Sequence, residues 1–358
     1  MGEIYTLSIM VTQNCNMECT YCFSYDNKKE DYLDQDKFIS KVKYEVWLIS
    51  KKQSLRTILI EFFGGEPLIK FNLIEKLLPE LQILDKRVQF KIPTNLLLID
   101  QYQYDVLKKY NVNISFSFDG LWTDIQRPQL SKRSALEQYI KRTNEIKSYN
   151  LKYCHSMIYP NGLKSVSILE NYLWIKKHYD LEPDFVLVRD NKVWSNDDTN
   201  LCIYRLNEFM NYCLKIDPIS IPTLFSHPIT KIINLKIKGF KANYCGITKS
   251  KKLISYTGKE YPCNIFIGKN IDSSPDELII KLEKALHNTK CENCEIRDLC
   301  DKGCPVQIME NRFQQEDNLC ILFKELNRIA KVFLAYAEYN PNSNIAKAIE
   351  KIIKIEEI

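Results

Sequence analysis

The chain has 358 residues, of which 45% are hydrophobic and 27% are charged, as in an ordinary soluble protein of about two domains. Its 50 basic and 45 acidic residues give a net charge of +5, which does not indicate a nucleic-acid partner. The sequence has no run of roughly 18 to 20 apolar residues that predicts a membrane span, and no secretory signal at its N-terminus. We therefore expect a cytoplasmic protein with neither a membrane nor a nucleic-acid partner.

Strands and helices alternate through the first two thirds of the sequence. Apolar periodicity predicts strands at residues 4–11, 57–63, 88–92, 112–118, 151–159 and 185–189. Helical stripes are predicted at residues 34–50, 72–84, 101–110, 135–147, 166–178 and 200–215. Strand–helix units in this order favour parallel strands with right-handed crossovers. The sequence thus predicts an α/β fold, a partial (β/α)6 barrel of the TIM type, with its chemistry at the C-terminal ends of the strands.

The pattern changes after the predicted barrel. From about residue 235 the strands become short and cysteines crowd together, until helical periodicity returns at Leu319. We expect three domains: the barrel at 1–220, a cysteine-rich domain at 235–325 and a helical tail at 326–358. The tail is predicted to form two helices broken at residues 340–342, with apolar stripes that pack against the barrel rather than bind a partner.

Thirteen cysteines stand out in a chain expected in the reducing cytosol, where disulfides are rare. They indicate metal binding or catalysis rather than a disulfide framework. Cys15, Cys19 and Cys22 are spaced C-x3-C-x2-C in the loop after the first strand. Four-iron clusters are held by cysteine thiolates and most use four, so three thiolates leave one iron open to another ligand. No fourth Cys or His stands nearby to close a zinc tetrahedron.

A second motif, Gly64-Gly65-Glu66-Pro67, follows the next predicted strand. The two motifs together, in this order, resemble the signature of radical S-adenosylmethionine (SAM) enzymes. The resemblance implies a [4Fe–4S] cluster on the triplet, SAM on the open iron and a 5′-deoxyadenosyl radical as the reactive species. It also implies that Gly64, Gly65 and Glu66 face the ammonium group of SAM. Without that role Glu66 would be a turn residue before a proline.

Other residues near the C-terminal ends of the strands match the family by context. Thr94-Asn95 follows the third strand, Ser117-Phe118-Asp119-Gly120 ends the fourth, and Arg127-Pro128 lies in the loop after it. By this resemblance, the SAM-binding residues would also include Tyr21, Asn95, Ser117, Arg127 and Leu187. Asn95 and Asp119-Gly120 can equally be turn residues, and Leu187 a core residue.

The later cysteines resemble the SPASM domain, which carries two auxiliary four-iron clusters. By this resemblance one cluster would be held by Cys291, Cys294, Cys300 and Cys320, and the nearer one by Cys245, Cys263 and Cys304. With the first cluster this makes three [4Fe–4S] clusters. Zinc is the rival for the four closely spaced thiols, but it leaves the other three unexplained. Cys202 and Cys213 are candidates for a fourth ligand of the nearer cluster, although their helical spacing favours core packing.

Three residues are candidates for catalysis. Cys154 and His155 lie on the fifth strand, where side chains alternate, so one of them should point into the barrel. A thiol there would be able to donate a hydrogen atom to a substrate radical, and the plainer interpretation is a packed side chain. Asp119 is the third candidate.

The resemblance leaves three functions open. The first is a peptide maturase that abstracts hydrogen from a ribosomally made precursor peptide and forms a thioether, C–C or C–O crosslink, or epimerises a residue. The second is an anaerobic sulfatase maturase that forms formylglycine; there an aspartate follows the cysteine equivalent to Cys263, whereas this chain has Asn264, which cannot accept a proton as a carboxylate does. The third is a non-catalytic iron–sulfur or zinc-binding protein.

The expected partners follow from the first function. They are the precursor peptide and an electron donor of the flavodoxin or ferredoxin type. Because the chain begins three residues before its first predicted strand, it has no room there for the winged-helix domain that grips leader peptides in many maturases. We therefore expect either a separate leader-binding protein or recognition by the barrel and tail.

Overall fold

The computed structural model describes residues 3–22, 32–239, 250–267, 293–300 and 318–357, together with Glu277, Ile280, Lys281 and Lys284. Contacts divide the chain into two compact units. The first unit comprises residues 1–118, 127–154 and 245–281, and the second comprises 119–126, 155–244 and 282–358. The three predicted domains were defined by sequence pattern rather than by contacts, and their boundaries stay predictions.

The strands form one open sheet of eight, in the order β6-β5-β4-β3-β2-β1-β7-β8. Their bounds are Glu3–Thr12 (β1), Leu55–Gly64 (β2), Val88–Thr94 (β3), Asn113–Ser117 (β4), Tyr153–Ile158 (β5), Glu182–Leu187 (β6), Lys251–Ile254 (β7) and Glu260–Tyr261 (β8). Within the first unit β1 to β4 pair in parallel, β7 adds in parallel to the other edge of β1, and β8 runs antiparallel to β7. The open α/β sheet confirms the predicted fold class.

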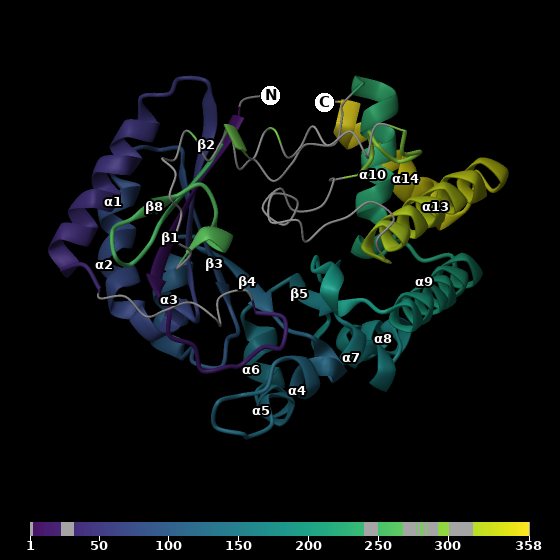
Figure 1. Ribbon diagram of the computed structural model, residues 1–358, viewed down its shortest axis with the longest axis horizontal. Coiled ribbons are helices and arrows are strands. Elements are labelled where there is room, and N and C mark those ends of the chain that lie inside the picture. The colour runs from purple at the N-terminus through teal and green to yellow at the C-terminus, as the bar shows by residue number, and fades with distance from the viewer. Residues whose placement is uncertain are drawn as a thin grey trace. The chain divides into compact units, whose positions relative to one another are not determined.

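Helices of the first unit cover one face of its strands, as Figure 1 shows for α1 and α2 beside β1, β2 and β3. They are α1 (Gln35–Ser50), α2 (Phe71–Gln82), α3 (Gln101–Lys109), α5 (Ala135–Lys141) and α6 (Thr143–Ser148), with short turns η1 (Pro67–Lys70) and η4 (Asn264–Phe266). Leu7 and Ile9 on β1 are fully buried, as are Val42 and Val46 on α1. In contrast Ser8, between the two apolar β1 residues, donates a hydrogen bond to Glu61 (3.1 Å), so the other face of the sheet carries polar groups.

The second unit is mostly helical. Its elements, besides β6 and most of β5, are η2 (Gly120–Trp122), α4 (Thr123–Gln126), α7 (Pro160–Ser165), α8 (Ile168–Tyr179), η3 (Asn191–Val193), α9 (Asn196–Ile216), α10 (Thr223–Lys238), α13 (Asn318–Tyr339) and α14 (Asn344–Glu357). The two tail helices confirm the predicted break at residues 340–342. α13 packs against α9 and α10, and α14 packs against α10 and α13. None of the described helices is both long and apolar enough to cross a membrane.

One residue, Asp217, connects the end of α9 to the start of the tail helix α14. Asp217 ends α9 in the left-handed conformation, with φ of 48°. Its carboxylate accepts hydrogen bonds from the backbone N–H groups of Asn344 (2.8 Å) and Ile345 (3.0 Å). A carboxylate at a helix N-terminus satisfies orphan donors and favours the helix dipole. Asp217 therefore ends one helix and starts another that lies 127 residues later.

Partly buried ion pairs connect the hairpin of β7 and β8 to α1. Lys252 contacts Glu45 (2.8 Å) and Glu260 (3.0 Å), and Lys41 contacts Glu260 (2.8 Å). Glu45 is only 5% exposed, so it depends on this partner to offset its desolvation. The hairpin is thus fixed to the first unit by a β-ladder on one side and by ion pairs on the other.

The structure differs from the predicted helices in four places. Helices α4, α7 and α10 were not predicted, and the single helix expected at 135–147 is broken into α5 and α6 at Arg142. The guanidinium of Arg142 donates to the carbonyl oxygens of Leu96 (2.9 Å), Leu97 (3.3 Å) and Ile99 (2.8 Å). The helix breaks where this side chain is needed to hold the loop between β3 and α3. Hydrogen bonds between residues so far apart in the sequence leave no periodic pattern in it.

Replacing Arg142 with alanine should destabilise the first unit. The three carbonyl groups lose charge-assisted donors, which we expect to lower the free energy of unfolding by about 2 kcal/mol. Lys354→Ala is the control, because Lys354 pairs with Glu350 on an exposed helix face and such pairs contribute about 0.5 kcal/mol or less. Urea unfolding of both variants measures the difference. Equal effects would contradict the role given to Arg142.

Candidate active site

The first three cysteines lie on the loop that follows β1. Cys15 and Cys19 are half-buried and Cys22 is exposed. The N–H of Met17 donates to the sulfur of Cys15 (3.4 Å), and the N–H of Cys22 donates to the carbonyl of Cys19 (3.0 Å). Burial raises the pKa of Cys15 to about 12, against the effect of the Met17 hydrogen bond. A metal that binds this thiol must therefore displace a proton.

The Gly64-Gly65-Glu66 motif holds the start of this loop. The N–H of Gly65 donates to the carbonyl of Thr12 (3.0 Å), and the N–H of Glu66 donates to the carbonyl of Asn14 (2.9 Å). A Cβ on Gly64 would lie 2.1 Å from the carbonyl oxygen of Thr12, and one on Gly65 would lie 2.4 Å from that of Asn14. Both glycines are needed because two backbones approach more closely than any side chain permits.

Glu66 is more than a turn residue. Its side chain is buried and accepts hydrogen bonds from Leu68 N–H (3.1 Å), the Thr94 hydroxyl (2.7 Å) and Asn95 N–H (2.8 Å). Burial raises its pKa to about 7, although the three hydrogen bonds oppose that shift. Glu66 thus joins the ends of β2 and β3 and presents a carboxylate whose charge is easily stabilised by a nearby cation.

Asn95 connects the end of β3 to the cysteine loop. Its side-chain amide donates to the side-chain carbonyl of Asn16 (2.8 Å), the neighbour of Cys15. Its backbone carbonyl accepts a hydrogen bond from the buried hydroxyl of Tyr139 (2.5 Å). The predicted site residues Glu66 and Asn95 are therefore brought together with the triplet in one hydrogen-bonded network.

The segment at residues 127–132 holds the other side of the cysteine loop. Glu18 N–H donates to the carbonyl of Pro128 (2.7 Å), and Leu130 N–H donates to that of Asn16 (3.1 Å). The guanidinium of Arg127 lies 5.2 Å from the centre of the Tyr21 ring, a cation–π distance. Arg127 and Tyr21, predicted separately, are therefore in contact.

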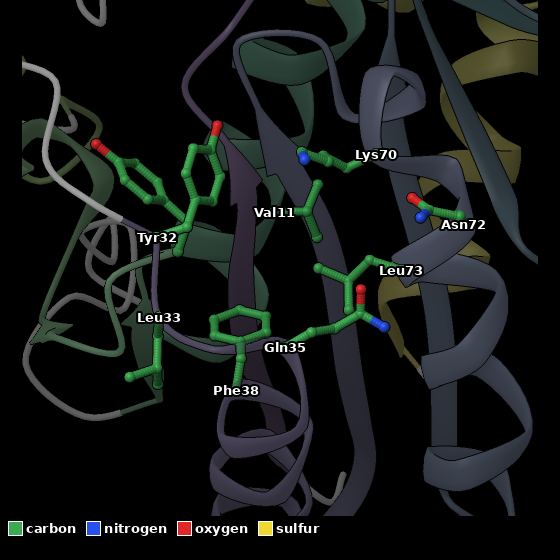
Figure 2. A pocket seen from close by; sticks show the side chains of 9 residues that line it. Val11, Tyr32, Leu33, Gln35, Phe38, Lys70, Asn72 and Leu73 are labelled. Atoms are coloured by element: carbon green, nitrogen blue, oxygen red, sulfur yellow. The ribbon is translucent and has the colours of Figure 1, made fainter.

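Two tyrosines that the sequence did not single out anchor the loop near β1. The hydroxyl of Tyr32 is 2.7 Å from that of Thr12, and the hydroxyl of Tyr256 donates to the side chain of Gln13 (2.6 Å). The two rings lie 4.6 Å apart. They border a cavity of about 170 Å³ between β1 and the starts of α1 and α2, where Lys70 lies near Tyr32 (Figure 2). Both tyrosines lie outside the sequence motifs, so the sequence did not predict this contact.

Asp119 holds a turn in the second unit. It is fully buried, and its carboxylate accepts hydrogen bonds from Met157 N–H (2.9 Å) and from the side chain of Gln126 (2.9 Å). The next residue, Gly120, has φ of 59°, and a Cβ there would lie 2.2 Å from the side-chain oxygen of Asn171. These contacts show that the Asp119 carboxylate holds this turn, and its catalytic role stays a prediction.

The other predicted residues differ in exposure. Cys154 is fully buried, whereas His155 is 43% exposed and its Nδ1 lies 3.0 Å from a carboxylate oxygen of Asp184. Ser117 is half-buried at the end of β4. Leu187 is 3% exposed at the end of β6, and it lines a cavity of the second unit.

The later cysteines are described in part. Cys263 is buried in the first unit; Cys294, Cys300 and Cys320 are half-buried in the second. Cys245, Cys291 and Cys304 lie outside the described residues. Cys202 and Cys213 are buried on the same face of α9 as Leu206 and Phe209, which accords with core packing.

The triplet fits a four-iron cluster by its donor chemistry. Three thiols lie on one short loop whose backbone is fixed from both sides, and thiolates are the ligands that such clusters use. In the described ranges, no three His, Cys, Asp or Glu side chains converge as a preformed metal site.

Gly65→Ala should disrupt the cysteine loop. The added methyl group would force Asn14 away and break the Glu66–Asn14 hydrogen bond, so we expect about four fewer irons per chain after anaerobic reconstitution. Gly239→Asn is the control, because Gly239 has φ of 59° with nothing within 4 Å of a built Cβ. Unchanged iron content in Gly65→Ala would contradict the role given to this close approach.

Glu66→Gln should change how stability depends on pH. The folded pKa of Glu66 is raised from 4.5 to about 7, so the folded state binds the proton more tightly than the unfolded state. The resulting stabilisation is present below the unfolded pKa and is lost as pH rises through the folded pKa. Between about pH 5 and pH 8 the protein without SAM should lose on the order of 3 kcal/mol relative to the Gln variant. Urea unfolding across this range measures the difference, and parallel curves would refute it.

Comparison with known proteins finds a family model that matches part of the chain. The sequence model of the Radical SAM superfamily matches residues 9–171, which contain the triplet, Glu66, Asn95 and Arg127. Among curated relatives, the uncharacterized protein MJ0907 of Methanocaldococcus jannaschii is 30% identical over 47% of this chain, and the match spans only 56% of that protein. The radical SAM cyclopropyl synthase TigE of Paramaledivibacter caminithermalis is 26% identical, over 91% of this chain and 74% of TigE.

Similarity also extends over most of the chain in other proteins. A cysteine-type anaerobic sulfatase-maturating enzyme of Clostridium novyi is 22% identical, over 84% of this chain and 88% of that enzyme. The fold is shared with native anSMEcpe with bound AdoMet (TM-score 0.71, 18% identity, 95% of this chain and 100% of that one). It is also shared with Streptococcus suis SuiB bound to its precursor peptide SuiA (TM-score 0.58, 18% identity, 88% and 75%). Residues 9–171 are therefore similar to the Radical SAM superfamily, and the fold is similar to that of solved proteins over most of the chain.

Proposed function

We propose that this enzyme modifies a ribosomally made peptide by radical chemistry, with Cys15, Cys19 and Cys22 as the ligands of its catalytic cluster. The observation that carries the proposal is the network that fixes the cysteine loop: Gly65 and Glu66 hold its start, and Pro128 holds its middle. The superfamily implies a [4Fe–4S] cluster and SAM, and this loop presents the three thiols that such a cluster needs.

The residues around the loop suit a zwitterionic cofactor. When bound, the cluster and SAM supply the radical that removes a hydrogen atom from the substrate. Glu66 offers a buried carboxylate for an ammonium group, which would lower the pKa of Glu66 and keep the carboxylate charged. Arg127 is 8% exposed and offers a guanidinium for a carboxylate, held against Tyr21. Gly64, Asn95, Ser117 and Leu187 complete the proposed set of SAM-binding residues.

We also propose two auxiliary clusters, as in the SPASM domain. The described candidates are Cys263 for one cluster and Cys294, Cys300 and Cys320 for the other. Cys263 is buried, and a thiolate in a protected site is shielded from oxidation. An electron donor of the flavodoxin or ferredoxin type and a separate leader-binding protein remain part of the proposal.

Peptides are the proposed substrates because solved relatives hold them: SuiB is bound to a precursor peptide. Sulfatase maturation is the second candidate, favoured by the similarity to the Clostridium novyi enzyme. Against it stands Asn264, whose amide oxygen lies 3.3 Å from the sulfur of Cys263. An amide at this position cannot serve as the proton acceptor that a carboxylate would be. Crosslinking or epimerisation is therefore the preferred reaction class.

Replacing the three loop cysteines together tests the proposal. The reconstituted protein should hold about twelve irons and release 5′-deoxyadenosine from SAM with dithionite, whereas Cys15→Ala/Cys19→Ala/Cys22→Ala should hold about eight and release none. Cys213→Ala, a buried cysteine of α9, is the control and should keep both properties. Deoxyadenosine release by the triple variant would sink the assignment of the catalytic cluster.

A further inference from the structure

A cavity of about 260 Å³ in the second unit is lined by β6, α10 and α13, and also by Leu299 and Cys300, the latter a proposed cluster ligand. The lining residues of α10 are 224, 227, 228 and 231, and those of α13 are 323, 326 and 327, so each helix contributes a single face. The volume lies below the roughly 300 to 1,000 Å³ of sites for drug-sized ligands. It suits one or two residues of a longer chain that continues outside.

The β6 wall of this cavity is a strand edge. The cavity touches three consecutive residues, Phe185, Val186 and Leu187. Consecutive side chains of a strand point to opposite faces, so a cavity that meets all three lies along the edge and not over a face. β6 is the last strand in the order of the sheet. The N–H of Val188 donates to Ile158 of β5 (3.1 Å), so by alternation the backbone groups of Phe185 and Leu187 point away from β5, toward this edge.

The polar lining of the cavity is cationic and amide in character. Arg189 follows β6 and its guanidinium lies 6.0 Å from the centre of the Phe323 ring, which holds its planar fork in place. His227 and Lys231 lie one turn apart on α10. Asp184 pairs with His155 and lies 3.9 Å from His227.

Asn327 supplies an independent sign of a ligand. It is 6% exposed, and its amide donates to the carbonyl of Phe323 (2.9 Å). Its side-chain oxygen is buried without a hydrogen-bond partner in the described part of the chain. A buried acceptor left unpaired costs about 1 to 3 kcal/mol, so such a group is expected to meet a donor when the site is in use. A peptide N–H is a donor of the right kind.

We propose that the cavity binds an extended, acidic segment of the peptide substrate along the edge of β6. The backbone of the segment pairs with Phe185 and Leu187 as an added strand, one N–H reaches Asn327, and a Glu or Asp side chain meets Arg189 and Lys231. The apolar lining, with Leu224 and Leu326, accepts a neighbouring aliphatic side chain. This assignment rests on the proposed action on peptides and names the substrate class by charge.

Fluorescence anisotropy of the reconstituted enzyme tests the assignment. The probes are fluorescein-labelled Gly-Val-Glu-Leu-Val-Gly amide and the same peptide with Gln in place of Glu. Arg189 and Lys231 recognise the carboxylate, so the Glu peptide should bind at least about tenfold more tightly. Arg189→Gln should abolish this preference, and Lys236→Gln, which changes a charge on α10 outside the cavity, should keep it. Equal binding of the two peptides, or a preference that survives Arg189→Gln, would overturn the proposal.

Two further measurements separate this site from a structural role. Asn327→Leu removes an unpaired buried oxygen, so it should not lower the melting temperature of the protein. It should nevertheless weaken the binding of the Glu peptide several-fold. Hydrogen exchange should show the amides of Phe185 and Leu187 protected by the Glu peptide, and protection elsewhere alone would refute strand addition. If the enzyme releases 5′-deoxyadenosine but binds the Glu and Gln peptides equally, this inference is wrong and the proposed function stands. If it prefers the Glu peptide but does not cleave SAM, the proposed function is wrong and this inference stands.

Discussion

The close approach of two backbones at the end of β1 and β2 is the constraint on which the site depends. Gly64 and Gly65 lie against the carbonyl groups of Thr12 and Asn14, where no side chain fits. The β-ladder therefore continues beyond the last regular strand residue and delivers the cysteine loop in a fixed direction. The loop carries few apolar residues of its own, so its contacts with the sheet, and not a local hydrophobic core, fix its conformation.

The same region buries an ionisable carboxyl group, that of Glu66. A carboxylate in a buried position is normally penalised, and here three donors from β3 and η1 only partly offset that penalty. A cationic group that binds beside Glu66 would offset the rest of this desolvation free energy, which the contacts formed on folding do not offset. A neutral side chain would fold more easily and offer less to a ligand.

The sequence predicted the strands, most helices and the residues of the loop, because periodicity and motif spacing are local signals. It did not predict the break at Arg142, since the guanidinium is recruited by carbonyl groups more than forty positions away. It allowed Asp119 to be a turn residue but did not predict Met157 and Gln126 as its partners, or that Tyr32 and Tyr256 brace the loop. Each of these contacts depends on which elements meet, and spacing along the chain carries no information about that.

The ion pairs that join the β7–β8 hairpin to α1 have a consequence for electron transfer. β7 is bonded to β1, the strand that leads into the first triplet, and Cys263 comes two residues after β8. If Cys263 holds an auxiliary cluster as proposed, this ligand and the first triplet follow strands of the same β-ladder, which the ion pair of Lys252 and Glu45 connects to α1. Tunnelling rates fall steeply with separation, so a stiff mount would keep the distance between donor and acceptor constant while substrate and partners come and go.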